Sequence, residues 1–404
     1  MNRIIDPSSY EDMRRVLKGI DVSSQGVENM IPKAFALPVK LTGVEIGAAN
    51  IIKQEMLTVG GDAAIARGIV EGKRKETDII LLGTVDKIRK LIQKLSHYTT
   101  FGIPKIRTDL AKLMKIHSNG YQYKLNCREK VLFLNQVKLM GILNITPDSF
   151  SDGGEFLQLE DAVKQALQMY KEGADIVDVG GESTRPGALP IDEKEELARI
   201  IPVIIRIREL KPEKIISVDT YKASVARKAI EAGADIVNDI TALRFDIQMT
   251  EVLRDYPDVP VILMHMQGTP QNMQKDPRYD DVVDELLDFF EERITYCLKE
   301  GINDERIIID PGIGFGKAFE HNMEILRRLK EFQSLGVPVM LGASKKSFID
   351  RIYSSSSQER LNGSLAVTAL AFQKMVHLVR IHDVKDHQQL LQTLQSIYSA
   401  DRRE

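Results

Sequence analysis

Short apolar segments recur through the last two-thirds of the chain, and nearly every one is continuous rather than alternating between apolar and polar residues. A strand that is apolar throughout is buried on both faces, as in a parallel sheet covered by helices. Their length and their content of Val and Ile predict strands rather than helices. There are eight, at residues 139–146, 175–181, 214–220, 235–240, 260–266, 306–312, 338–344 and 376–383.

Between these segments, apolar residues recur at steps of three and four, which predicts helices. Residues 162–170 and 225–230 show this period, and glycines suited to a left-handed cap follow them at Gly173 and Gly233. Parallel strands need such helical crossovers. Eight strand and helix units in succession predict a TIM-type (β/α)8 barrel, because open doubly wound sheets more often have five or six strands.

Polar residues stand at the carboxyl ends of the apolar segments. In a barrel these ends share one mouth, where active sites are built. A single polar residue at a strand end often only caps a helix or contacts solvent, but convergence on one cleft favours a function. The residues are Asn144, Glu182, Asp219, Asn238, His265, Asp310, Ser344, Arg380 and His382.

The first 117 residues have a different pattern. Residues 77–83 predict a buried strand, residues 85–95 a helix with one apolar face, and residues 50–56 an earlier helix that Gly60 and Gly61 end. We expect a small α/β domain at 1–117, with a ferredoxin-like arrangement as one candidate. The barrel then occupies 118–404, with a hairpin at 121–135 covering its bottom. Regulatory, oligomerising and substrate-channelling roles are all open for the first domain.

Composition excludes several classes of function. The 404 residues carry 55 basic and 58 acidic side chains, a net charge of −3, so no basic field points to nucleic acid. No apolar run reaches the length of a membrane span, and nothing at the start resembles a secretory signal. Cys127 and Cys297 are far apart and outside any CxxC pair, so a disulfide framework or cysteine zinc site is not indicated. A cytoplasmic protein is expected.

Charged residues at the predicted mouth suggest two kinds of binding. Arg380 and His382 lie two apart on the last strand, so they face the same side and suit a phosphate or diphosphate. Asp219, Asn238 and Asp310 bring two carboxylates and an amide to a flat heterocycle rich in hydrogen-bond donors. The same two acids could instead hold a metal ion.

A dedicated transition-metal site is not favoured, because the chain has no HExxH or comparable run. Mg²⁺ shared with a diphosphate needs only one or two protein oxygens, and Asn144 could supply one. The stretch 312–317 (GIGFGK) matches neither GxGxxG nor a P-loop, so a tight turn is its simpler interpretation. For Lys346, a solvated residue at a helix start and a functional one are equally open.

Eight motifs in order resemble the dihydropteroate synthase family, over about residues 121–395. The first two, at 140–154 (MGILNITPDSFSDGG) and 180–187 (GGESTRPG), are similar to the family's two mobile loops. The others are SVDT at 217–220, NDI at 238–240, MHMQG at 264–268, DPG at 310–312, SKK at 344–346 and RIHDV at 380–384. The third residue of SKK is the family's lysine, whereas Lys345 stands where the family commonly has Arg and Ile313 where it commonly has Phe.

The resemblance implies an enzyme that joins a pterin diphosphate to p-aminobenzoate in folate biosynthesis, a homodimer and the target of sulfonamides. It implies that Lys346, Arg380, His382 and Asp219 are catalytic. The pterin site would comprise Asp219, Asn238, Ile240, Met266, Asp310, Phe315, Gly342 and Lys346. The diphosphate site would comprise Asn144, Arg380 and His382, with Mg²⁺ on Asn144. The p-aminobenzoate site on the loops would comprise Phe150, Thr184, Arg185 and Pro186.

The implied reaction displaces diphosphate from the exocyclic methylene carbon of the pterin, with carbocation character, so stabilising the leaving group matters more than acid-base chemistry. Loops that close would keep water from the cation. Two rival functions remain. A pterin-binding methyltransferase would share the acids but not need the Arg380 and His382 pair, and a catalytically silent barrel would have lost the loop motifs or the lysine, which this chain keeps.

Overall fold

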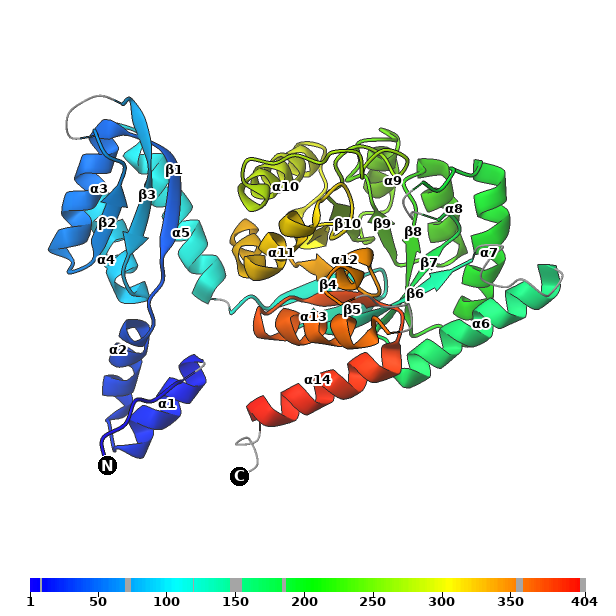
Figure 1. The fold of residues 1–404 in the computed structure, drawn as a ribbon, viewed down its shortest axis with the longest axis horizontal. Coiled ribbons are helices and arrows are strands. Elements are labelled where there is room, and N and C mark those ends of the chain that lie inside the picture. The colour runs from blue at the N-terminus through cyan, green and yellow to red at the C-terminus, as the bar shows by residue number, and fades with distance from the viewer. Residues whose placement is uncertain are drawn as a thin grey trace. The chain divides into compact units, whose positions relative to one another are not determined.

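The chain divides into two compact units, Met1–Gly120 and Tyr121–Glu404 (Figure 1). The computed structural model describes residues 1–7, 9–69, 74–118, 120–145, 155–183, 187–353 and 359–399. The sequence analysis places the division at residues 117 and 118. Each unit has its own apolar core, as the separate buried clusters show.

The first unit begins with a helical hairpin, α1 (Tyr10–Gly19) and α2 (Ser24–Ala34), that packs through Leu17, Val27 and Ile31. A three-stranded antiparallel sheet follows, in the order β1-β3-β2. Its elements are β1 (Val39–Glu45), α3 (Ile46–Thr58), β2 (Asp62–Ile65), β3 (Glu76–Leu82), α4 (Val85–Leu95) and α5 (Ile103–Ser118). The predicted strand and two helices are confirmed as β3, α4 and α3. A ferredoxin-like sheet needs four strands, and the described residues of this unit form three.

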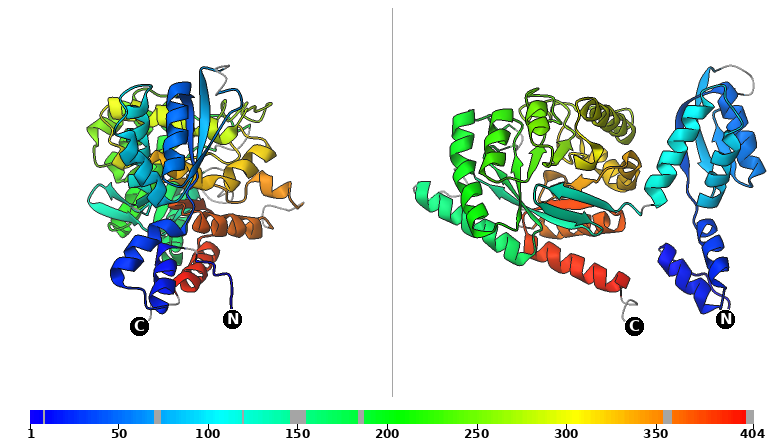
Figure 2. Two further views of the ribbon diagram at one scale, coloured as in Figure 1. Left: turned by 90° about the vertical axis from the view of Figure 1, so that its left-hand side faces the viewer. Right: turned by 180° about the vertical axis from the view of Figure 1, so that it is seen from behind.

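Burial alternates along this small sheet. Residues 77, 79 and 81 of β3 are buried, and 76, 78, 80 and 82 are exposed. The buried face packs against α3, α4 and α5 through Ile52, Met56, Leu91 and Leu110, and these helices lie together on one side of the sheet (Figure 2). The period of two explains why a strand with only apolar residues at 79–82 has one exposed face.

The second unit is a (β/α)8 barrel, as predicted. Its eight strands are parallel and follow the order β11-β10-β9-β8-β7-β6-β13-β12, and a bridge between Ile309 and Val339 closes the ring. The strands are β6 (Lys138–Asn144), β7 (Ile176–Gly180), β8 (Ile215–Asp219), β9 (Ile236–Asp239), β10 (Val261–Met264), β11 (Ile307–Asp310), β12 (Met340–Leu341) and β13 (Leu378–Ile381). Each lies within one of the eight predicted segments except at Lys138, and almost every residue in them is buried.

Helices surround the strands and bury one face against them, so the main core is a ring between the two layers (Figure 1). They are α6 (Glu155–Glu172), α7 (Glu193–Leu210), α8 (Ala223–Ala232), α9 (Met249–Asp255), α10 (Val282–Lys299), η2 (Asp304–Arg306), α11 (Phe319–Arg327), η3 (Leu329–Leu335), α12 (Ser347–Asp350), α13 (Leu361–Gln373) and α14 (Val384–Ser399). Gly233 ends α8 with a φ of 119°, which a residue with a side chain rarely adopts. No helix in the described ranges is long and apolar enough to span a bilayer.

A hairpin of β4 (Tyr123–Cys127) and β5 (Lys130–Leu134) covers the amino ends of the barrel strands, as predicted. Its residues Leu125, Cys127, Leu132 and Leu134 form one cluster with buried residues near the amino ends of several strands, among them Ile176, Ile236 and Ile308. The described hairpin therefore covers this end of the barrel and leaves the carboxyl ends as the place for a site.

Candidate active site

Strand ends bring the predicted polar residues to one mouth. Asn144, Asp219 and Asp310 are the last residues of β6, β8 and β11, and Asn238 is the last but one of β9. His265 follows β10, and Arg380 lies within β13. Parallel strands present their carboxyl ends together, so the eight apolar segments with polar residues at their ends were sufficient to predict this convergence.

Arg380 is held by two buried carboxylates at the centre of the mouth. Its Nε lies 2.6 Å from Asp178 Oδ2, and its Nη2 lies 2.7 Å from Asp219 Oδ2. Asn238 Nδ2 donates to the same oxygen of Asp178 at 3.0 Å. The guanidinium still has Nη1 without a hydrogen bond to the described residues, so one edge can meet a ligand. Arg380 was predicted to bind an anion, and Asp178 was not among the predicted residues.

Asp310 and Lys346 face each other across Gly342. A methyl group at Gly342 would lie 3.4 Å from Asp310 Oδ2 and 4.0 Å from Lys346 Nζ, so the missing side chain leaves open the space that both line. The other oxygen of Asp310, Oδ1, accepts the backbone N–H of Gly312 at 2.8 Å. Lys346 Nζ donates to Ile313 O and lies 4.4 Å from the centre of the Phe315 ring.

An apolar wall stands beside these charges. Ile240 and Met266 form a small buried cluster, separate from the barrel core, against which Phe315 packs. All three were predicted to line the pterin pocket. Met264, Met273 and Tyr221 complete the wall. They were not predicted, because their sequence pattern is that of ordinary core residues.

Burial sets the charge states at the mouth. It raises the pKa of Asp219 to about 7, against the opposing effect of Arg380. It also raises the pKa of Asp310, which Lys346 opposes, and lowers the pKa of Lys346 to about 8, which Asp310 opposes. Although burial works against the charged form, Asp178 and Asp219 raise the pKa of Arg380. Such displaced values are typical of functional sites.

Asn144 and Asp219 converge over a second glycine. A methyl group at Gly180 would lie 3.7 Å from both Asn144 Oδ1 and Asp219 Oδ2. Two oxygen atoms thus line a space that any other residue at 180 would fill. In the described residues no group of three or more His, Cys, Asp or Glu side chains could hold a metal ion by itself.

The cationic residues near β12 and β13 divide into two sets. His382 Nδ1 lies 3.1 Å from Ser344 Oγ, which keeps the ring near the mouth. Lys345 Nζ instead pairs with Asp383 Oδ1 at 2.7 Å, and its backbone N–H donates to Ser364. Lys345 is thus bonded to Asp383, just before α14, and to Ser364 of α13.

Two predicted loops bear on the site only in part. Phe150, Thr184, Arg185 and Pro186 lie outside the described residues. The base of the second loop is described, and Lys222 Nζ joins its two ends, 2.7 Å from Glu182 Oε2 and 2.8 Å from Ile191 O. Glu182, which the sequence analysis placed at the mouth, thus acts as an anchor for its own loop.

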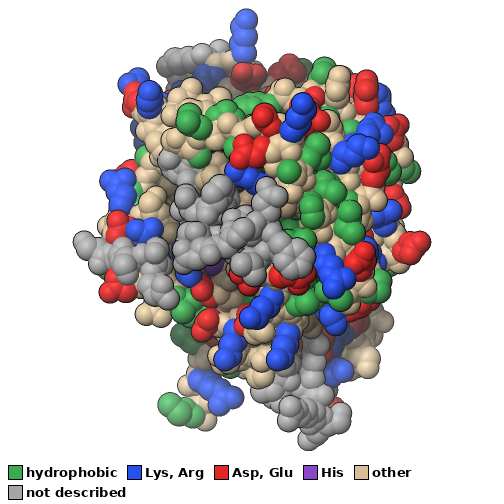
Figure 3. Space-filling model, turned by 90° about the vertical axis from the view of Figure 1, so that its right-hand side faces the viewer, with side chains coloured by type: hydrophobic (Ala, Val, Ile, Leu, Met, Phe, Trp, Pro, Cys, Tyr) green, Lys and Arg blue, Asp and Glu red, His purple; other side chains and the backbone are tan. Residues whose placement is uncertain are grey.

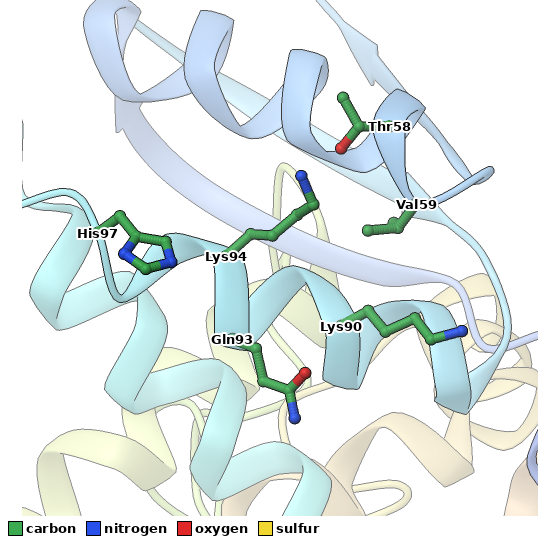
Figure 4. A pocket seen from close by; sticks show the side chains of 6 residues that line it. All are labelled: Thr58, Val59, Lys90, Gln93, Lys94 and His97. Atoms are coloured by element: carbon green, nitrogen blue, oxygen red, sulfur yellow. The ribbon is translucent and has the colours of Figure 1, made fainter.

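The described residues also form two surface hollows, one on each unit. A pocket on the first unit is lined by Thr58, Val59, Lys90, Gln93, Lys94 and His97 (Figure 4). Its two lysines pair with Asp86 and Glu55 at 2.8 Å, so it is no obvious anion site. A groove between α7 and α8, on the face with scattered apolar side chains in Figure 3, contains Leu197, Ile201 and Ile205. Neither offers the convergent chemistry of the mouth.

The residues at the mouth could bind a flat, polar ring and stabilise negative charge on a group that leaves it. Carboxylates on one side accept hydrogen bonds, Lys346 donates one, and the apolar wall with Phe315 supplies a stacking surface. Arg380 and His382 lie where negative charge on a leaving group could be met.

Comparison with known proteins gives consistent matches over the barrel. Residues 140–382 match the family described as "Pterin binding enzyme". Dihydropteroate synthase of Escherichia coli is 44% identical over 277 residues, which cover 69% of this chain and 97% of that protein. The structure of the Xanthomonas albilineans enzyme with 4-aminobenzoic acid is 42% identical, with a TM-score of 0.65, and covers 69% of this chain and 99% of that one.

One relative extends into the first unit. A probable bifunctional folylpolyglutamate synthase/dihydropteroate synthase of Halobacterium salinarum is 39% identical over 386 residues. The alignment covers 95% of this chain but 45% of that protein. The first unit therefore has a counterpart in at least one larger protein.

Proposed function

The chain belongs to the dihydropteroate synthase family of pterin-binding enzymes, and from this premise we propose that it condenses 6-hydroxymethyl-7,8-dihydropterin diphosphate with p-aminobenzoate. The products would be 7,8-dihydropteroate and diphosphate. As a member of this family it is a transferase of folate biosynthesis. The observation that carries the detailed proposal is the convergence of Asp219, Asn238, Asp310 and Lys346 beside the wall formed by Ile240, Met266 and Phe315.

The geometry supports a pterin bound edge-on to Asp310. The carboxylate has one oxygen, Oδ2, directed to the open space over Gly342, while Oδ1 is used by Gly312. A pterin presents an amino group and a ring N–H side by side, which suit a carboxylate acceptor. Lys346, on the other side of the same space, would donate to a ring nitrogen or carbonyl.

The proposed reaction forms one bond and breaks one. The bond between the methylene carbon and the diphosphate oxygen breaks, and both electrons leave with the diphosphate. The arylamine nitrogen then bonds to that carbon and releases a proton to water. The amine is neutral at pH 7, so the protein's contribution is to bind, orient and stabilise charge, and the open edge of Arg380 with His382 would meet the departing diphosphate.

Mg²⁺ remains part of the proposal. Asn144 Oδ1, which lines the space over Gly180, is an oxygen donor of the kind that Mg²⁺ prefers, and a diphosphate would supply the rest. The ion, when bound, would neutralise charge on the diphosphate. Asn144 would hold it, while Asp219 stays paired with Arg380.

An omission assay tests the proposal. The purified chain is mixed with the pterin diphosphate, p-aminobenzoate and Mg²⁺, and diphosphate and dihydropteroate are both measured with each component left out in turn. We expect equal amounts of both products, and only in the complete mixture. Pterin binding without either product would instead favour a silent barrel, and methyl transfer from a reduced folate would favour the methyltransferase. The predicted homodimer is tested by light scattering of the same sample.

The structures of relatives support the choice of ligands. The Yersinia pestis synthase was solved as a complex with a sulfonamide drug, and it is 39% identical to this chain with a TM-score of 0.65. The Xanthomonas albilineans enzyme was also solved with 7,8-dihydropteroate, at 40% identity and a TM-score of 0.62. We propose that this chain takes the same classes of ligand.

A further inference from the structure

The glycine-rich stretch 312–317 packs closely against the residues that follow β10. Its three glycines have φ values of 68°, 80° and 62°. A methyl group at Gly312 would lie 2.1 Å from His265 O, and one at Gly316 would lie 2.5 Å from Gln267 O. Both contacts are with backbone, which cannot move aside cheaply, so only glycine fits there. The stretch is a tight turn, as its simpler interpretation predicted, but one that lies against the mouth.

Lys317, which ends this turn, is buried beneath it. The side chain is 2% exposed. Its Nζ lies 2.9 Å from His265 Nδ1, 3.0 Å from Phe315 O and 3.3 Å from His265 O. A lysine amino group carries two N–H groups when neutral and three when charged, and here it lies within hydrogen-bond distance of three acceptors, from the turn and from the end of β10. Lys317 therefore fastens the turn to the neighbouring strand.

His265 is suited to accept this bond. Burial, reinforced by Lys317 and Arg244, lowers the pKa of His265 to about 2, so the ring is neutral at the pH of the cell. A neutral ring with its proton on Nε2 leaves Nδ1 as an acceptor. Burial also lowers the pKa of Lys317 well below its ordinary value, against the effect of Asp310.

The opposite side of the turn forms part of the pocket. Ile313 O accepts the hydrogen bond from Lys346, and the Phe315 ring lies 4.4 Å from the same ammonium. Phe315 thus contributes its carbonyl to Lys317 and its ring to Lys346. A change beneath the turn would be transmitted directly to the lysine that faces Asp310.

On the basis of the proposed function, we infer that Lys317 is a positioning residue for the pterin half of the reaction, because it holds Phe315 and Ile313 O against Lys346. It does not reach the substrate. Loss of its three hydrogen bonds would let the turn move, so that Lys346 is displaced from Asp310 and meets more water. Binding of p-aminobenzoate would be affected little.

The test compares Lys317→Met, which keeps the unbranched side chain as far as Cε and removes the amino group, with Lys330→Met, the same change at an exposed lysine. For Lys317→Met we expect KM for the pterin diphosphate to rise about tenfold or more, because the change leaves buried acceptors of the turn unpaired. KM for p-aminobenzoate should change less than about twofold. The alkaline fall of kcat/KM, set by Lys346, should move to higher pH. Lys330→Met should match the parent in all three.

Two outcomes would overturn the inference. One is an unchanged pterin KM and pH profile, and the other is a parallel rise of both KM values, which indicates general disruption. If Lys317→Met does not fold, as judged by circular dichroism, Lys317→Gln keeps two N–H donors and should give an intermediate rise. If the parent makes no dihydropteroate, the proposed function fails, and equilibrium binding of the pterin diphosphate to the same variants still tests the role of Lys317.

Discussion

The lowered pKa of Lys346 predicts an alkaline limit to activity well below that of an ordinary lysine. Burial lowers this pKa from 10.5 to about 8, and Asp310 only partly opposes it. If the ammonium must donate to the pterin, kcat/KM should fall about tenfold for each pH unit above 8. At pH 9 about one Lys346 in ten would carry its charge, whereas nearly all would with an ordinary pKa.

The contribution of Lys346 to folding stability changes with pH in the opposite direction to kcat/KM, so a loss of activity can be told apart from unfolding. The folded state releases the Lys346 proton near pH 8, and the unfolded state keeps it to 10.5. The unfolded state therefore binds more protons in this window, and the contribution of Lys346 to stability rises with pH. At about 1.4 kcal/mol per pKa unit, the full change is roughly 3 kcal/mol. Loss of activity above pH 8 would thus not reflect unfolding at Lys346.

The assay is kcat/KM for the pterin diphosphate between pH 6.5 and about 9.5, with melting followed by circular dichroism in the same buffers. Lys346→Arg stays charged throughout, so its profile should lose the alkaline fall even if its rate at pH 7 is lower. Lys345→Arg changes the neighbouring lysine, which pairs with Asp383 outside the pocket, and should keep the fall. A parent profile that is flat to pH 9.5 would refute the role of Lys346.

Three further predictions concern the same pocket and the division of the chain. Asp310→Ala removes charge-assisted hydrogen bonds worth about 1.5–3 kcal/mol, so calorimetry should show pterin binding weakened roughly tenfold or more, and unchanged affinity would contradict the assignment. Gly342→Ala places a methyl group 3.4 Å from Asp310 Oδ2 and 4.0 Å from Lys346 Nζ. We expect a raised pterin KM with an unchanged melting temperature, and a normal KM would mean that the pterin does not enter this space. A fragment of residues 121–404 should fold and make dihydropteroate, because this compact unit contains every described site residue and corresponds to the Escherichia coli relative. An inactive but folded fragment would give the first unit a catalytic role.

The barrel was predictable because each of its strands can be recognised from a short stretch of sequence. A continuous apolar run indicates a strand that is buried on both faces, and a polar residue at its end, such as Asp219 after 215–218, marks the carboxyl end of the strand. The first unit was predicted less completely. Helices α1 and α2 form a small core of their own through Leu17 and Ile31, a contact between short segments that no period in the sequence announces.

Within the site, the sequence located the chemistry but not the pairing. Asp178 lies inside an apolar segment, and its only signal is that a carboxylate there must have a partner. Its partner, Arg380, is 202 residues away, and no local pattern can report a contact at that separation. Lys317 is hydrogen-bonded to His265, which lies 52 residues earlier. Because this contact is also distant in sequence, the local pattern around Lys317 predicted only a turn.

The ring of strands has one junction that differs from the rest. β11 and β12 are joined by a single bridge, Ile309 with Val339, whereas the other neighbouring strands of the described barrel form ladders. Asp310 follows on one side of this junction, and Gly342 and Lys346 follow on the other. A substrate that contacts both Asp310 and Lys346 would link β11 to the residues that follow β12, across the junction with the fewest backbone pairs in the barrel. Transient opening there would then be the motion that substrate suppresses most, and slower amide hydrogen exchange at 307–310 and 338–342 would be its signature.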